Sequence, residues 1–388
     1  MKIPITKPFF GDEERRALVV PLDTGWVVQG PQVERFEQKF AAYAGAPHAV
    51  ATTSCTTALH MAVAALGLKP GDEVIVPGFT WVATPNVVEY MGATPVFCDI
   101  DLRTFNIDVA KIEPLITSRT VGIIPVHLFG LAADMDPVLA IARRHRLWVV
   151  EDAACGFATR YHGRHVGTFG DAGCFSFHPR KSITTGEGGM LTTAREDLAR
   201  AALALRDHGA SHTDLSRHTS KTGFLLADYA VLGYNYRMTD MQGGLGCAQM
   251  DRAPALVAAR VSRARKYDEA FAGCGWLRRP YVPEGYVHGY QSYVTLFAPD
   301  TPSLANVDAL HGRRNALMAA LEAQGIATRQ GTHAPVVQTY YATKYPKARD
   351  ACPNSVVADR LSLSLPLYPQ MTDEEQAFVV SAVLGAKP

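Results

Sequence analysis

The sequence predicts an α/β protein of two domains whose main sheet is mostly parallel. The chain has 388 residues, which is too long for one ordinary core. Its hydrophobic content of 47% and charged content of 19% are those of a folded protein rather than a disordered one. Between residues 48 and 193, continuous apolar runs alternate with helical segments. Such runs are typical of parallel strands that are buried on both faces.

Composition also argues against several classes of protein. The formal net charge of +1 gives no indication of binding to nucleic acid or to an anionic membrane. No apolar run has the length of a membrane span, and the first five residues lack the core of a signal peptide. The seven cysteines are scattered and form no Cys-x-x-Cys pair, which argues against a disulfide framework and against a zinc site. We therefore expect a cytoplasmic enzyme without a metal.

Two helices are expected before the first strand. One begins at Asp12, where acidic residues in the first turn suit the helix dipole. The other covers residues 33–44, in which apolar side chains recur at helical spacing: Val33, Phe36, Phe40 and Tyr43.

A possible anion site follows. A strand at 48–52 runs directly into the hydroxyl-rich stretch 53–57 and then into a helix that ends at Gly67. Free N–H groups at a helix start, together with threonine hydroxyls, can hold an anion. Simple capping of the helix by a hydroxyl is the commoner explanation of such a pattern. The glycines and lysine of a Walker-type loop are absent.

The remaining elements continue the alternation. Strands are expected at 73–77, 94–99, 122–126, 147–150, 172–177 and 190–193, with helices at 84–90 and 136–144. Residues 196–250 are expected to be largely helical, interrupted by a mobile polar loop at 208–221 and by a turn at 233–238. A further helix is expected at 240–250, after that turn. Further on we expect a connecting helix at 249–267, a strand at 290–296, a helix at 305–324, a strand-like segment at 325–329 and a closing helix at 371–384. The predicted domains are 1–250, with the N-terminal segment, and 251–388.

One lysine has an unusual position. Lys181 lies between the strand-like run 172–177 and a turn rich in glycine at 186–189. Burial at the end of a strand lowers the pKa of a lysine toward that of an amine nucleophile. The glycines allow close approach of the backbone or a positive φ. The alternative is an ordinary lysine in a surface loop.

Several candidate residues follow the carboxyl ends of predicted strands, where α/β sheets bind ligands. They are Asp152, Lys181, Trp81 and the helix start at Thr56, and they could share one crevice. An aldehyde cofactor with a pyridine ring and a phosphate needs a lysine for a Schiff base, a carboxylate for the ring nitrogen, an aromatic face and a phosphate cup. These residues supply one of each. Alternatively, Asp152 caps a helix and Trp81 belongs to the core.

Four motifs carry a resemblance to a known family: EDAA at 151–154, YxGRxVGxFGD at 161–171, SFxxxKxITTGEGG at 176–189 and GYNYRMTD at 233–240. They resemble the DegT/DnrJ/EryC1/StrS aminotransferases, which are pyridoxal-phosphate enzymes that mostly aminate keto sugars attached to nucleotides. The resemblance spans the chain from Gly25 to Leu367. It implies the aspartate-aminotransferase fold, with a mostly parallel sheet of the seven-stranded type in a large domain and a smaller α+β C-terminal domain.

The resemblance also implies roles around the cofactor ring, which would be that of pyridoxal 5'-phosphate. Lys181 would form the Schiff base and move protons between cofactor and substrate. Asp152 would pair with the pyridinium nitrogen, and Trp81 would stack on the ring. Two positions depart from the family pattern. Cys155 stands where glutamine or histidine is usual, near the phenolic oxygen, and a thiol is a weak donor. Cys55 stands where a glycine is usual.

Further implied roles concern the cofactor phosphate and the subunits. Thr56, the backbone of Thr57 and Ser176 would hold the phosphate. Asn235 would reach the phosphate of the partner subunit's cofactor, so the enzyme would be an obligate homodimer with shared active sites.

The substrate is indicated less directly. Residues 328–334 resemble the region that lines the sugar pocket of perosamine-type synthases, which favours a nucleotide-linked 4-keto-6-deoxyhexose as acceptor and L-glutamate as donor. His333 and His178 are candidate substrate residues, although His333 could be an ordinary loop histidine. The alternatives are a cyclitol ketone as substrate, a sugar dehydratase of the same fold and a non-enzymatic regulator. Lys181 argues against the dehydratases, in which histidine typically replaces this lysine, and the complete set of cofactor groups argues against the regulator.

Overall fold

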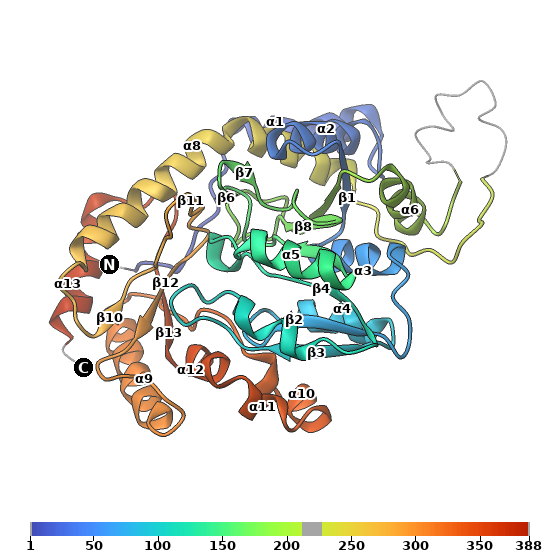
Figure 1. Cartoon of the computed structure of the whole chain (residues 1–388). Coiled ribbons are helices and arrows are strands. Elements are labelled where there is room, and N and C mark those ends of the chain that lie inside the picture. The colour runs from blue at the N-terminus through green and yellow to red at the C-terminus, as the bar shows by residue number, and fades with distance from the viewer. Residues whose placement is uncertain (1, 212–226, 387–388) are drawn as a thin grey trace.

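The computed structural model describes residues 2–211 and 227–386 of the chain. Its centre is a seven-stranded sheet with the order β1-β9-β8-β5-β4-β2-β3 (Figure 1). The strands are β1 (His48–Thr52), β2 (Glu73–Pro77), β3 (Thr94–Cys98), β4 (Thr120–Ile123), β5 (Trp148–Asp152), β8 (Ala172–Ser176) and β9 (Gly189–Thr193). Only β9 runs antiparallel to its neighbours, β1 and β8. The predicted mostly parallel sheet is therefore confirmed.

Helices cover both faces of this sheet (Figure 1). On one face lie α2 (Pro31–Ala44), α5 (Met135–His145) and the first part of α8 (Asp240–Ala270), with α1 (Asp12–Thr24) packed on α8. On the other lie α3 (Cys55–Ala65), α4 (Ala83–Tyr90) and α6 (Glu196–Arg206). Neighbouring residues of a strand alternate between the two cores, as the pleat requires: Val150 packs with α3, and Val149 packs on the opposite face.

The C-terminal part adds a smaller antiparallel sheet. It contains β10 (Leu277–Arg278), β12 (Tyr293–Phe297) and β13 (Ser362–Leu365), flanked by α9 (Val307–Ala323) and α13 (Asp373–Gly385). A third sheet joins β6 (Arg160–Tyr161) and β7 (Arg164–His165) to β11 (Tyr286–Val287). Helix α8 passes the proposed boundary at 250/251 without a break. The division into 1–250 and 251–388 stays a prediction.

Several expectations need correction or restriction. The strand expected at 122–126 is found at Thr120–Ile123. Residues 227–232, expected within a largely helical stretch, are not helical. The two helices expected at 240–250 and 249–267 are one helix, α8. The strand expected from 290 begins at Tyr293. The segment 325–329 forms no strand, but only single bridges between Ile3 and Ile326 and between Arg329 and Ser364. Residues 212–221 of the expected mobile loop lie outside the described residues.

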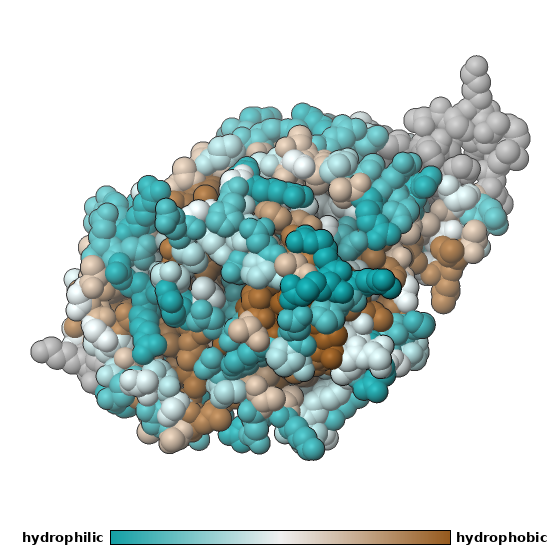
Figure 2. All heavy atoms as spheres, viewed as in Figure 1, coloured by the Kyte–Doolittle hydropathy of each residue, from teal (hydrophilic) through white to brown (hydrophobic). Residues whose placement is uncertain are grey.

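Several elements near the C-terminus were not expected. They are β13 and the short helices α10 (Thr339–Lys344), α11 (Ala348–Ala351) and α12 (Pro353–Leu361). Hydrophilic side chains cover most of the face shown in Figure 2, with smaller apolar patches between them. Among the described residues, no helix has both the length and the apolar character needed to span a membrane.

Candidate active site

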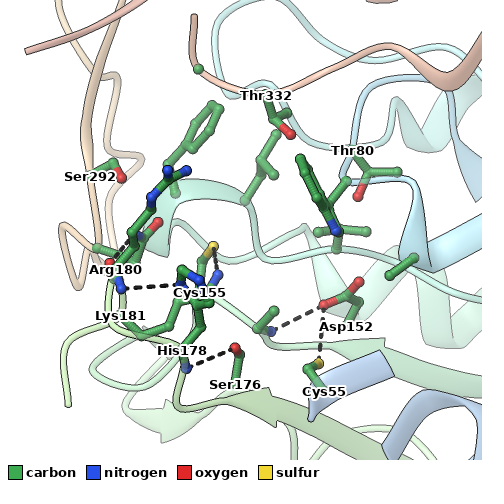
Figure 3. Close-up of a pocket in the computed structure, with 18 of the residues that line it drawn as sticks. Cys55, Thr80, Asp152, Cys155, Ser176, His178, Arg180, Lys181, Ser292 and Thr332 are labelled. Atoms are coloured by element: carbon green, nitrogen blue, oxygen red, sulfur yellow. Dashed lines mark hydrogen bonds between the residues drawn. The ribbon is translucent and has the colours of Figure 1, made fainter. Parts of the chain in front are cut away.

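A cavity of about 480 Å³ opens where the carboxyl ends of β5 and β8 meet the C-terminal part of the chain (Figure 3). Its wall includes residues from the N-terminus, from both sheets and from the segment 329–332. Most of the predicted site residues line it: Thr56, Trp81, Asp152, Cys155, Ser176, His178 and Lys181. Thr57, Asn235 and His333 do not line it. The predicted common crevice therefore exists.

Asp152 is the last residue of β5, and its side chain is buried. Thr84 Oγ1 donates to Asp152 Oδ2 over 2.8 Å, and the backbone N–H of Ala154 donates to Oδ1 over 3.1 Å. The thiol of Cys55 lies 4.0 Å from Oδ1. Burial raises the pKa of Asp152, and the hydrogen bonds from Thr84 and Ala154 oppose that rise only in part. A cationic partner in the cavity would stabilise this carboxylate in its charged form.

Lys181 faces the cavity beside Cys155 (Figure 3). Its Nζ lies 3.2 Å from Cys155 Sγ, and its backbone N–H donates to the carbonyl of His178. The unusual cysteine is thus the hydrogen-bond partner of the Lys181 amine, and a thiol is a weak partner for it.

The helix start at Ser54 has the geometry of a phosphate cup. Ser54 caps α3 and accepts from the backbone N–H of Thr57 over 3.2 Å. In the described part of the chain, the amides of Cys55 and Thr56 have no assigned acceptor. A Cβ at Gly189 would lie 2.3 Å from the Ser54 backbone, so only glycine allows β9 to approach this turn so closely. The Thr57 amide, which the sequence assigned to the phosphate, is already used by the cap.

Trp81 and His333 lie together at the cavity mouth. The indole is 54% exposed, and its ring centroid lies 5.8 Å from that of His333. Trp81 is therefore not a core residue, and one aromatic face remains open to a ligand. The carbonyl of His333 accepts from the backbone N–H of Thr80 over 3.0 Å. His333 thus supports the wall without lining the cavity itself.

Ser176 and His178 follow the end of β8 on the same side as Lys181 (Figure 3). The backbone N–H of His178 donates to Ser176 Oγ over 3.3 Å, and the His178 ring accepts from the backbone N–H of Arg180 over 3.2 Å. Burial lowers the pKa of His178, and nearby cations add to this effect against an opposing contribution from Glu187. Because Nδ1 already accepts from Arg180, a neutral His178 ring carries its hydrogen on Nε2 and can donate it to a ligand.

Asn235 is exposed and lies away from the cavity of its own chain. Its backbone pairs with Asp207 in a single bridge. The role predicted for Asn235 in a partner subunit stays a prediction.

Several site residues were not predicted. Thr80 and Thr84 hydrogen-bond to each other over 3.0 Å, and Thr84 also holds Asp152. Their spacing of one helical turn after a predicted strand was a usable signal. Arg180 and Arg329 line the cavity as well. Arg329 belongs to the stretch 328–334 that was expected to line the sugar pocket, although it was not singled out there.

The residues fit an aldehyde cofactor that carries a pyridine ring and a phosphate. The cavity joins an available amine, a buried carboxylate, an exposed aromatic face and a hydroxyl-capped helix start with free amides. Among the described residues, no group of His, Cys, Asp and Glu side chains could hold a metal ion.

Comparisons with known proteins agree with this geometry. The model of the DegT/DnrJ/EryC1/StrS aminotransferase family matches residues 9–384. The chain is 38% identical over 382 residues to the spore coat polysaccharide biosynthesis protein SpsC of Bacillus subtilis, covering 98% of this chain and 96% of the relative. It is 38% identical over 387 residues to the GDP-perosamine synthase of Caulobacter vibrioides, covering 98% and 97%. The sugar aminotransferase Spr1654 of Streptococcus pneumoniae in its PMP form superposes with a TM-score of 0.89 at 28% identity, covering 99% of both chains.

Proposed function

Because this chain belongs to the DegT/DnrJ/EryC1/StrS aminotransferase family, we propose that it transfers an amino group from L-glutamate to a nucleotide-linked 4-keto-6-deoxyhexose. The protein is a pyridoxal-phosphate-dependent transaminase of the sugar aminotransferase class. One observation carries the proposal: Lys181 and the buried Asp152 face a single cavity beside the free amides of Cys55 and Thr56.

Each cofactor group has a corresponding residue. The amides at the start of α3 and the hydroxyls of Thr56 and Ser176 would hold the phosphate. Asp152 would keep the ring nitrogen protonated, and a cationic ring favours the charged form of this buried carboxylate. When bound, the cofactor supplies an electron sink for the carbon that loses or gains a proton.

Lys181 would bind the cofactor carbonyl and move the proton. Its Nζ reaches the cavity from the end of β8, with Cys155 as its near neighbour at 3.2 Å. Such an amine can take a proton from one carbon and return it to another. Trp81 would cover one face of the ring and orient it toward this amine.

The acceptor is inferred from residues with hydroxyl groups that line the cavity. Hydroxyl groups of Thr80, Thr332, Ser292 and Ser364 line it, and hydroxyls can both donate to and accept from a sugar. The Caulobacter vibrioides relative is named for GDP-perosamine. Together these observations support a nucleotide-linked keto sugar.

The test combines chemical labelling with substrate turnover. Borohydride reduction of the purified enzyme should fix the cofactor to the peptide that contains Lys181, and Lys181→Ala should bind the cofactor without turnover. The wild-type enzyme should convert a nucleotide-linked 4-keto-6-deoxyhexose with glutamate, followed by mass spectrometry. Labelling of another lysine would contradict the site assignment. Turnover of cyclitol ketones alone would contradict the proposed acceptor.

A shared active site is a second part of the proposal. Asn235 is exposed and does not line the cavity of its own chain, which is consistent with a role in a partner subunit. Apolar side chains are also exposed on and after α1, including Val19, Leu22 and Val28. Such a surface suits burial against a second copy.

Mixing a Lys181→Ala chain with an Asn235→Ala chain tests the shared site. A hydrogen bond to a charged group contributes about 1.5–3 kcal/mol, so Asn235→Ala should weaken cofactor retention roughly ten- to a hundredfold. In a mixed dimer of Lys181→Ala and Asn235→Ala chains, one site keeps both residues, and activity should return at low cofactor concentration. If mixed dimers form without any activity, Asn235 acts within its own chain.

A further inference from the structure

A second and much smaller cavity lies beside Lys181. Its volume is about 10 Å³, which gives room for one particle of the size of a water molecule but not for a phosphate or an organic acid. Its wall comes from the N-terminal segment at 7–9, from residues 182–184, from helix α8 and from Pro369. Lys181 lines both this cavity and the larger one. The small cavity is thus separate from the proposed ligand site, yet it adjoins the residue that carries the reactive amine.

Arg260 of α8 places a buried cation on the wall of the small cavity. Only 2% of this residue is exposed. Its Nη1 donates to the carbonyls of Gln291 and Leu367 over 3.1 and 3.0 Å, whereas its Nε has no hydrogen-bond partner among the described residues. Burial lowers the pKa of Arg260 to about 10. A buried guanidinium with an unused donor is stabilised by an acceptor, and most strongly by a negatively charged one.

Two backbone amides of the same wall also lack an acceptor. They belong to Ser182 and Ile183, which are both buried. The preceding amide, of Lys181, donates to the carbonyl of His178, and the following one, of Thr184, donates to a side-chain oxygen over 3.2 Å. In the part of the chain that the structure describes, no acceptor is assigned to the two amides between them. Buried N–H groups need a partner, and successive N–H groups of a turn are suited to an anion.

The charged side chains that line the small cavity are all positive. They are Lys7, Lys181 and Arg260, and the lining contains no aspartate or glutamate. Much of the remaining wall is apolar, with Leu256 and Ile183 among its members. Water would need acceptors for its two hydrogens in such a place, whereas an anion needs only donors. A halide ion is only slightly larger than a water molecule, so the size, the donors and the charge of the cavity favour a halide.

The acidic groups in the neighbourhood are engaged elsewhere. Asp152 and Glu187 line the larger cavity and not the small one. Glu14 accepts from Gln249 Nε2 over 2.7 Å and forms an ion pair with Arg252 at 2.7 Å. These acids therefore leave the buried charge of the small cavity without a counter-ion.

We propose that the small cavity binds one small monovalent anion, such as chloride, through Arg260 Nε and the backbone amides of Ser182 and Ile183. Because these amides belong to the turn that follows Lys181, the bound anion would fix this turn and with it the position of the lysine. The proposal does not depend on which keto sugar the enzyme uses.

Bromide diffraction tests the site directly, because bromide resembles chloride and gives an anomalous signal. Crystals of the wild-type holoenzyme, grown without halide and soaked in sodium bromide, should show an anomalous peak between Arg260 and the backbone at 182–183. The holoenzyme is used so that the cofactor phosphate keeps bromide out of the cup at α3. A water molecule in this cavity without an anomalous peak would overturn the proposal. Peaks on the surface alone would show an adventitious ion only, with the same consequence.

Thermal unfolding of the holoenzyme tests the site in solution. Sodium gluconate, whose anion is too large for the cavity, keeps the ionic strength constant. Raising chloride from about 1 to about 200 mM should increase Tm by at least about 2 °C and then saturate, since a ligand of the folded state stabilises it. Arg260→Gln should abolish this increase. Arg314→Gln is the matched control and should keep it, because Arg314 is equally buried, also has an unpartnered Nε and lines neither cavity.

Two results in solution would contradict the anion site. One is an equal Tm of the wild type in chloride and in gluconate. The other is a chloride effect that Arg260→Gln retains. If Arg260→Gln does not fold, the bromide-soaked wild-type crystals still decide between an anion and water.

Discussion

Glu151 and Asp152 are adjacent carboxylates at the end of β5, and their surroundings differ completely. Glu151 is fully buried and accepts from His127 Nε2 over 2.9 Å and from the backbone N–H groups of Gly167, Phe169 and Gly170 over 2.6 to 2.8 Å. Asp152 points to the opposite face of the sheet, where Thr84 and the Ala154 amide are its hydrogen-bond donors.

The pKa values of the two groups move in opposite directions. Burial raises both, but the hydrogen bonds and charge of His127 and the amides outweigh burial and lower the pKa of Glu151. For Asp152 burial prevails. The fold thus stabilises the charged form of Glu151 by hydrogen bonds, whereas the charged form of Asp152 would be stabilised by a bound cation. A buried carboxylate with too few hydrogen-bond donors and no cation beside it indicates a ligand site. A buried carboxylate whose oxygens all accept hydrogen bonds indicates a structural role.

Of the changes that test this contrast, removing the charge of Asp152 should have the largest effect, and the effect should be on kcat. Asp152→Asn keeps the shape of the side chain but cannot hold a cationic ring, so kcat should fall roughly two to three orders of magnitude. The free energy of unfolding of the cofactor-free protein should not decrease. Steady-state kinetics and urea titration provide the two measurements. Near-normal amino transfer by Asp152→Asn would show that another group holds the cationic ring.

The equivalent change at Glu151 should affect stability and leave catalysis nearly intact. Glu151→Gln has one carbonyl oxygen where the glutamate has two accepting oxygens, so at least one buried amide of the 167–170 turn loses its acceptor. The expected loss is about 1–3 kcal/mol in the free energy of unfolding, measured by urea titration. If kcat per folded molecule falls as far as in Asp152→Asn, the two roles are not separate.

The pH dependence of stability should differ in sign between the two groups. A lowered pKa means that Glu151 contributes stability above its ordinary value of 4.5, and this contribution is lost as the pH falls through the lowered folded value. A raised pKa means that protonated Asp152 contributes below 3.8 and that this contribution is lost as the pH rises through the raised folded value. Unfolding of cofactor-free protein from about pH 7 to about pH 3 covers the Glu151 window below 4.5 and the Asp152 window above 3.8.

Over that range, the stability deficit of Glu151→Gln should narrow toward acid pH. Any stability advantage of Asp152→Asn should instead grow toward neutral pH. Parallel curves for the two variants would show that neither carboxylate titrates as described.

The smallest effect is expected from the hydroxyl that supports Asp152. Thr84→Val removes the donor at 2.8 Å and should raise the pKa of Asp152 further. The acid limb of the kcat/KM profile should move to higher pH, with a loss of at most about tenfold near neutrality. Thr84→Ser keeps the hydroxyl and should behave as the wild type. An unchanged profile for Thr84→Val would remove Thr84 from the site.

Much of the main sheet was predictable because its strands are uninterrupted apolar runs between capped helices. The strand at 73–77 was expected at the residues where it occurs. Lys181, Asp152 and Trp81 were predictable because each follows such a strand. The C-terminal elements were not predictable, because α12 and β13 are stabilised by packing against distant parts of the chain rather than by a local sequence pattern.

The residues around Asp152 show the same limit. Thr84 precedes it by 68 positions, and the Glu151 network connects 127 with 167–170 across two loops. No local pattern encodes which of two adjacent acids will find four donors. Sequence reasoning located the carboxylates, and only the fold distinguishes them.

The hydrophobic core on the α3 side of the main sheet contains residues from both parts of the chain, and this determines how the protein unfolds on heating. It includes Leu59 and Val74 from the main sheet region together with Val294, Val356 and Leu361 from the C-terminal part. Helix α8 continues through residue 250 from one part into the other. A fragment that ends near 250 would lack about a third of this core and would expose the side chains that pack against the missing part. Heating should therefore give one cooperative transition, and a protease cut within α8 should release no independently folded piece.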